Sequence, residues 1–165
     1  VYQSDRFMIQ LAWFIFVVFG IALSAIDLEH FRLPNVLTLP LALAIFILLL
    51  IDSTQLHQYR DLRYAIYSSL ALTFFYFLVH LISRGGLGFG DVKFAIAIGF
   101  LTGYGSTIGT YVASMLAFIL GSIVGLFLIT IKGGGRKTKV PLGPFMFAGA
   151  IASIWVIPHI EALLL

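Results

Sequence analysis

FAIAIGFLTGYGSTIGTYVASMLAFILGSIVGLFLITI, residues 94–131, is a run of 38 positions without a charged side chain. A membrane-spanning helix needs about 20 apolar residues, so this run is too long for one helix and long enough for two. The segment GYGS, residues 103–106, is the natural turn between them because it contains two glycines. We therefore expect two helices here, and this division decides how the rest of the chain is arranged.

The composition of the whole chain indicates a protein embedded in a lipid bilayer. Of its 165 residues, 61% are hydrophobic and 10% are charged, and the mean hydropathy is +1.07. A soluble domain has about 25% charged residues, so this chain cannot cover a water-facing surface. The net charge of +3 is too small and scattered for a nucleic-acid partner. The absence of cysteine excludes disulfides, thiolate metal ligands and a cysteine nucleophile.

Four further apolar runs have the approximate length of membrane helices. They are the run between Arg6 and Asp27, residues 36–51, residues 64–83 and residues 140–160. With the two helices of the central run, they predict an all-α polytopic membrane protein with about six transmembrane helices. No repeat or soluble segment interrupts the pattern, so we expect residues 1–165 to form a single membrane-embedded domain.

The basic residues predict the orientation of these helices. With six helices, the loops after the first, third and fifth share one side of the membrane and contain seven basic residues, against three on the other side. The seven are Arg32, Arg84, Lys93, Lys132, Arg136, Lys137 and Lys139. The positive-inside rule places this side in the cytoplasm and both termini outside. A single helix over residues 94–131 would reverse the assignment. Asp27 and Asp91 are then both expected at the cytoplasmic side.

The sequence GGLGFGDVK, residues 85–93, places one of these aspartates after closely spaced glycines. Gly86, Gly88 and Gly90 permit a close approach between the backbone and a bound molecule. A phosphate is not favoured as that molecule, because Asp91 would repel it. An alternative interpretation makes Asp91 the N-cap of the following helix, with the glycines forming the turn.

Asp27 favours a functional interpretation of both acids. It ends the first apolar run, where its negative charge faces the unfavourable end of the helix dipole, so capping does not explain it. A solvated interfacial acid or a partner for Arg32 remain alternatives. An ionisable residue at membrane depth is nevertheless a candidate functional residue. Two neighbouring carboxylic acids share one proton, so one can take a proton from water while the other donates to a carbonyl oxygen, as in aspartic peptidases.

Three motifs resemble those of a known family. GLGFGDVK, residues 86–93, is similar to the GxGD signature of type IV prepilin peptidases, and IDLEHFRLPNVLTLP, residues 26–40, is similar to the segment around the family's first aspartate. VPLGPFMFAG, residues 140–149, resembles the Pro-x-Gly-Pro stretch that enters the last helix. The three matches follow the order of the family and span most of the chain from Ala25 onward.

The resemblance implies a multi-pass aspartic endopeptidase of the bacterial inner membrane, with Asp27 and Asp91 as the catalytic pair and with no cofactor or metal. It also implies that the substrates are type IV prepilins or the pseudopilins of type II secretion. Cleavage would follow a glycine on the cytoplasmic side, between a short basic leader and a hydrophobic helix. Long family members add a cytoplasmic domain with paired cysteines and methylate the new N-terminus. Because this chain lacks cysteine and such a domain, we expect a short, peptidase-only member or a trimmed one, and methyltransferase activity is doubtful.

Several residues near the two aspartates are candidates for contact with the substrate, together with Gly86, Gly88 and Gly90. Glu29 can pair with a basic leader, although an ordinary interfacial charge also explains it. Lys93 can act on an aspartate or a substrate carbonyl, or extend to the lipid head groups. We expect Pro141, Gly143 and Pro144 to break the chain at the membrane edge near the active site.

Other polar residues are expected to have structural or solvated roles. Asn35 stands where the resembled family commonly has an acid, and we expect it to cap the second helix. His30 is expected to be solvated, and His80 to make a structural hydrogen bond near the end of the third helix. Asp52 and Asp61 are expected at the outer side, away from the reaction.

Three other functions are compatible with parts of the sequence. A small proton- or ion-coupled transporter also needs membrane aspartates, but carriers hold them near the midplane, whereas here both lie at helix ends. A presenilin-type protease is less similar, because Ile26 rather than a tyrosine precedes the first aspartate. An archaeal preflagellin peptidase would differ in substrate rather than chemistry. Small-residue pairs such as Gly99 and Gly103 predict close helix packing, within the fold or in a homo-oligomer.

Overall fold

The computed structural model describes residues 7–57, 59–83, 86–131 and 141–164, and all of its regular elements within these ranges are α-helices. The six helices are α1 (Phe7–His30), α2 (Asn35–Gln55), α3 (Tyr59–Ile82), α4 (Phe89–Gly103), α5 (Ile108–Ile131) and α6 (Gly143–Leu164). The expected all-α fold with six helices is confirmed. Five of the seven basic residues used for the orientation lie outside the described residues, namely Arg84, Lys132, Arg136, Lys137 and Lys139.

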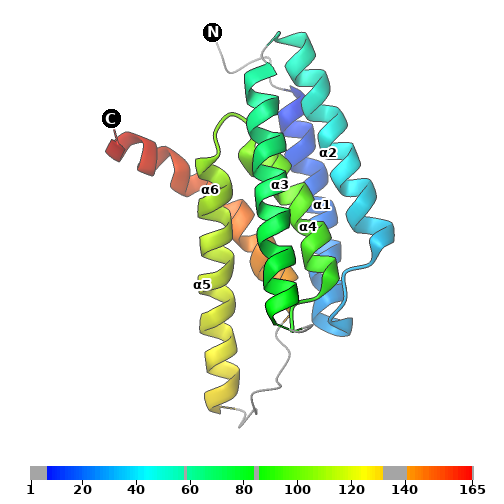
Figure 1. Ribbon diagram of the computed structural model, residues 1–165, viewed down its shortest axis with the longest axis vertical. Coiled ribbons are helices and arrows are strands. Elements are labelled where there is room, and N and C mark those ends of the chain that lie inside the picture. The colour runs from blue at the N-terminus through cyan, green and yellow to red at the C-terminus, as the bar shows by residue number, and fades with distance from the viewer. Residues whose placement is uncertain (1–6, 58, 84–85, 132–140, 165) are drawn as a thin grey trace.

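The uncharged run at residues 94–131 divides where the sequence predicts. Helix α4 ends at Gly103 and α5 begins at Ile108. In the turn between them, Gly105 has a φ of 87°, a left-handed conformation that glycine adopts without a steric penalty. The two helices therefore run in opposite directions, and the ends of α3 and α5 lie at the same end of the bundle (Figure 1).

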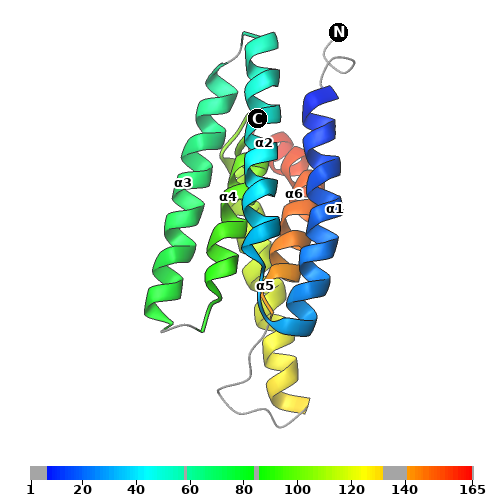
Figure 2. The same ribbon diagram turned by 90° about the vertical axis from the view of Figure 1, so that its right-hand side faces the viewer.

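Helix α4 lies inside the bundle, and the other helices surround it (Figure 2). It contacts each of the other five helices, and most of its side chains are buried. Helices α1, α2, α3 and α5 are long and apolar enough to cross a membrane, whereas α4 has 15 residues. At about 1.5 Å per residue, α4 spans roughly 22 Å, less than the roughly 30 Å of a bilayer core. At least one end of α4 is therefore recessed within the membrane depth.

Close packing against α3 fixes the position of α4. A Cβ atom on Gly99 would lie 2.4 Å from the Ser69 Cα, and one on Gly103 would lie 2.3 Å from the Ser68 Cβ. The Ser69 hydroxyl also donates a hydrogen bond to the Ile96 carbonyl at 3.0 Å. The prediction that these small residues allow close helix packing is thus confirmed for α3 and α4 within the fold.

Candidate active site

A cavity of about 420 Å³ opens at the end of the bundle where α1 ends and α4 and α6 begin. Its walls come from the end of α1, the segment that leads into α2, the glycine loop with the first turn of α4, and the residues that precede α6. The residues from the sequence prediction that line it are Asp27, Gly86, Gly88, Gly90, Asp91, Lys93 and Pro141. Residues from three distant parts of the chain, within 27–35, 86–93 and 141–142, therefore form one site.

Asp27 lies in the last turn of α1 and is 4% exposed. Its Oδ2 accepts a hydrogen bond from the Gly143 backbone N–H at 2.9 Å. Gly143 is the first residue of α6, so the carboxyl faces the positive end of that helix dipole, which offsets the unfavourable dipole of α1. A Cβ atom on Gly143 would lie only 2.9 Å from the same oxygen. The glycine therefore allows α6 to start directly against Asp27.

The connection after α1 holds the first turn of α4 in place. Phe31, directly after α1, has a φ of 52°, a conformation that costs about 1–2 kcal/mol for a non-glycine residue. The chain then runs through the buried Leu33 into α2. A Cβ atom on Gly90 would lie 2.6 Å from the Leu33 Cβ and 2.9 Å from the Leu33 carbonyl oxygen. This close approach carries Asp91 toward Asp27.

Asp91 is 7% exposed and lies in the first turn of α4. The N-cap of α4 is Gly88 rather than Asp91, so the N-cap interpretation of Asp91 is wrong. Instead, the Asp91 carboxyl accepts a hydrogen bond from the Gly88 backbone N–H, an arrangement like the return contact of a capping box. Among the described residues, its Oδ1 has no hydrogen-bond partner. The carboxyls of Asp27 and Asp91 are close enough to interact electrostatically.

Lys93 and Asn35 form a contact that the sequence did not predict. Helix α2 has Pro34 as its N-cap and no side-chain cap, so the expected capping role of Asn35 is wrong. The Asn35 Oδ1 accepts a hydrogen bond from the Lys93 Nζ at 2.7 Å. The Lys93 Nζ also lies 4.9 Å from the centroid of the Phe89 ring, which is a cation–π distance. The contact links the start of α2 to the first turn of α4 beside Asp91.

Three candidates lie outside the cavity lining, namely Gly143, which binds Asp27, and Glu29 and Pro144. Glu29 is exposed at the end of α1, and its carboxylate is 3.9 Å from the Nδ1 of the exposed His30. Pro144 is half-buried in the first turn of α6 and does not line the cavity. Among the described residues, no group of three or more histidine and acidic side chains is placed to hold a metal ion.

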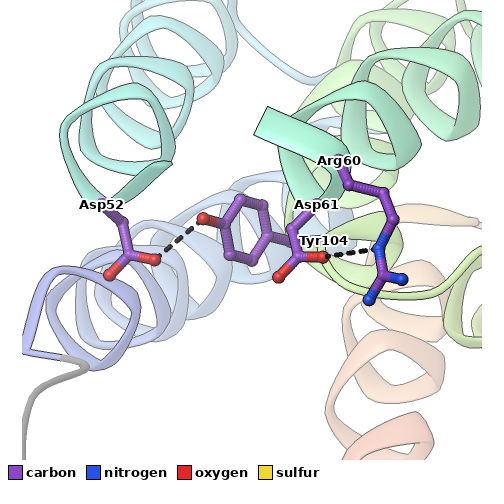
Figure 3. Close-up of polar contacts among 4 residues, drawn as sticks. All are labelled: Asp52, Arg60, Asp61 and Tyr104. Carbon is purple, nitrogen blue, oxygen red and sulfur yellow. Dashed lines mark hydrogen bonds and ion pairs between the residues drawn. The ribbon is translucent and has the colours of Figure 1, made fainter. Parts of the chain in front are cut away.

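Asp52 and Asp61 lie at the opposite end of the bundle, near the turn after α4 (Figure 3). Both are buried, at 2% and 6% exposed, although the sequence analysis expected only that they would be remote. The Tyr104 hydroxyl donates a hydrogen bond to the Asp52 Oδ2 at 2.8 Å, and the Arg60 Nε is 3.8 Å from the Asp61 Oδ1. Asp52 thus joins α2 to the turn after α4, and Asp61 pairs with its neighbour within α3, both away from the cavity.

Fold and site together define a polytopic α-helical membrane protein with two interacting, buried carboxyls at one end. The chain belongs to the type IV leader peptidase family, whose family model matches residues 14–130. It is 35% identical over 141 residues to the prepilin leader peptidase/N-methyltransferase of Legionella pneumophila, and 30% identical over 139 residues to that of Pseudomonas aeruginosa. Each comparison covers 82% of this chain and 46% of the relative, so the chain spans about half the length of these proteins. No solved structure matches the chain.

Proposed function

We propose that this protein is a membrane aspartic endopeptidase that removes the short basic leader of type IV prepilins or pseudopilins, using Asp27 and Asp91 as a catalytic pair. The observation that carries the proposal is the meeting of these two buried carboxyls in one cavity. They come from α1 and α4, and each is held by the backbone N–H of a glycine. The names of the relatives support a prepilin as the substrate.

The chemistry follows from a pair of carboxyls that holds one proton. The ionised carboxylate takes a proton from a water molecule, whose oxygen attacks the carbonyl carbon of the scissile peptide. The protonated partner donates its proton to the carbonyl oxygen, which gives a tetrahedral intermediate. The intermediate collapses when its C–N bond breaks. The leaving nitrogen receives a proton from the pair, and one hydroxyl of the intermediate returns a proton to the ionised carboxylate. The products are a carboxylic acid and an amine, and the pair returns to its starting protonation.

The position of the two carboxyls suits a substrate that has a helix in the bilayer and a leader beyond the end of the bundle. The cavity lies where α1 ends and α4 begins, so a substrate helix in the bilayer would present its leader junction at that level. The excess of basic residues in loops on this side supports a cytoplasmic location. Lys93, on the cavity wall, is placed to contact a substrate carbonyl.

The test is cleavage of a model prepilin by the purified protein in detergent or in lipid nanodiscs. The wild type should release the leader after a glycine, as identified by mass spectrometry of both products. Asp27→Asn and Asp91→Asn should each abolish cleavage while the protein remains folded. The matched controls Asp52→Asn and Asp61→Asn change buried acids at the other end and should retain activity per folded molecule. A folded wild type that cleaves no leader would refute the proposed activity.

A further inference from the structure

His80 lies outside the cavity lining, yet it contacts the loop that holds Asp91. It is half-buried near the end of α3. Its Nδ1 is 2.6 Å from the Leu87 carbonyl oxygen. A carbonyl oxygen can only accept a hydrogen bond, so the Nδ1 carries a proton and donates it. The expectation of a structural hydrogen bond for His80 is confirmed. Because the partner is Leu87, the bond connects His80 to the loop that holds Asp91.

The carbonyl of Leu87 and the N–H of Gly88 belong to one peptide group. Such a group is planar, and the described residues contain no cis peptide bond. Its oxygen therefore points toward His80 while its N–H points to the other side, where it donates to the Asp91 carboxyl. A single rigid plane thus connects His80 to Asp91. Rotation of this plane would break both hydrogen bonds together.

Two further contacts link the end of α3 and the residue after it to Leu87 and its neighbour Phe89. The Leu87 N–H donates to the Ser83 hydroxyl oxygen at 3.1 Å, and the Leu87 side chain is 8% exposed. The His80 ring also packs edge-on against Phe89, with their centroids 5.6 Å apart. Both backbone polar groups of Leu87 are therefore bound, one by His80 in α3 and one by Ser83 directly after it, although glycines on either side would otherwise leave this residue free to move.

We propose that His80 is a positioning residue that orients the Asp91 carboxyl through the Leu87–Gly88 peptide group. The hydrogen bond from His80 fixes the orientation of that peptide. It also polarises the peptide, which strengthens the Gly88 N–H as a donor to the carboxyl. Ser83 assists by holding the preceding N–H. This inference rests on the proposed function for its catalytic consequence, while the structural coupling between His80 and Gly88 stands independently of it.

Three substitutions at His80 separate this role from simple packing. In His80→Asn, the side-chain amide nitrogen takes nearly the place of the Nδ1, two bonds from the Cβ. In His80→Gln, the amide nitrogen takes the place of the Nε2, which faces away from Leu87. His80→Leu keeps bulk without a donor. If orientation of Asp91 matters, the leucine and glutamine variants should lower kcat about 10- to 100-fold, since a misplacement of about 1 Å costs about that much.

The asparagine variant should recover most of kcat, and KM should change little in all three because the cavity lining is intact. Amide hydrogen exchange at Gly88, measured at residue resolution in the full chain, provides a second readout. It should accelerate in His80→Leu and His80→Gln and remain near wild type in His80→Asn. His57→Leu, at an exposed histidine at the other end of the bundle, is the control and should change neither readout.

The outcomes distinguish this inference from the proposed function. Wild-type kcat and unchanged Gly88 exchange in His80→Leu would refute the positioning role. Equal losses in the asparagine and glutamine variants would also refute it, because bulk rather than the donor would then matter. If His80→Leu fails to fold, two results still decide whether His80 positions Asp91. They are the comparison of His80→Asn with His80→Gln and the rate of Gly88 amide exchange in Ser83→Ala. If the wild type cleaves no prepilin, the proposed function fails, and Gly88 exchange alone decides whether His80 holds the peptide.

Discussion

Gly90→Ala tests whether the close approach of α4 to the segment before α2 sets the geometry of the carboxyl pair. The new Cβ would lie 2.6 Å from the Leu33 Cβ, 2.9 Å from its carbonyl oxygen and 3.1 Å from its nitrogen. Carbon atoms in contact prefer about 3.5–4.0 Å, so the two segments must separate by about 1 Å. Backbone atoms form part of the contact, so rotation of a side chain cannot relieve it. Gly90 does not have a positive φ, so the expected effect of the substitution comes from the steric clash and not from backbone strain.

We expect Gly90→Ala to lower kcat more strongly than it lowers the free energy of unfolding. Overpacking costs about 1–3 kcal/mol, while replacement of a helical glycine by alanine returns up to about 1 kcal/mol. The free energy of unfolding should therefore fall by about 0–3 kcal/mol. A displacement of Asp91 by about 1 Å relative to Asp27 should lower kcat about 100-fold.

The measurements are the kcat of prepilin cleavage and the thermal midpoint in the same detergent. Gly121→Ala is the matched control. Its Cβ would lie 3.2 Å from the Leu142 Cδ1, the end of a flexible side chain, and at ordinary contact distances of 3.5 and 3.8 Å from two ring atoms of Phe145. This control should keep activity within a few-fold. Wild-type kcat in Gly90→Ala would refute the claim that the contact with Leu33 positions Asp91.

Three further outcomes follow from contacts outside the carboxyl pair. Asn35→Asp should raise the free energy of unfolding by up to about 1 kcal/mol, because the aspartate would form an exposed ion pair with Lys93. Asn35→Ala should lower the thermal midpoint, and a higher midpoint in this variant would contradict the contact. Because the chain has no cysteine, single cysteines in His30→Cys and His57→Cys can report the topology. The cysteine at position 30 should be labelled only from the cytoplasm and the one at position 57 only from outside. The reverse pattern would show that the orientation is inverted. Tyr104→Phe should cost about 1–3 kcal/mol by removing a hydrogen bond to the buried Asp52, with unchanged cleavage per folded molecule; loss of cleavage would contradict its remote role.

The fold was accessible from the sequence because its determinants are local. Apolar length, the glycine turn at residues 103–106 and the charges between helices are read along the chain, and the division of residues 94–131 is confirmed. The two aspartates were found because each breaks a local rule. An acid at the end of α1 opposes the helix dipole, and an acid after three glycines precedes an apolar helix.

The contacts that organise the site were missed because they join distant segments. Asn35 looked like an ordinary N-cap, since nothing near it in the chain indicates that Lys93 lies within hydrogen-bond distance. The glycines were expected to contact substrate, and in the structure Gly88 and Gly143 also bind the two carboxyls through their N–H groups. The Pro-x-Gly-Pro motif marks the start of a helix in the sequence. Only the structure shows that this helix N-terminus faces Asp27 and offsets the unfavourable dipole of α1.

The most direct test of the proposed pairing compares Asp27→Asn, Asp91→Asn and the double variant in one prepilin cleavage assay. If the two carboxyls share one proton and act as a unit, each single variant should lower kcat by at least about 1,000-fold, and the double variant should lose no more than the worse single one. Two single variants with measurable partial activity, and a double variant whose loss is the product of theirs, would show that the aspartates act independently and would contradict the catalytic pair.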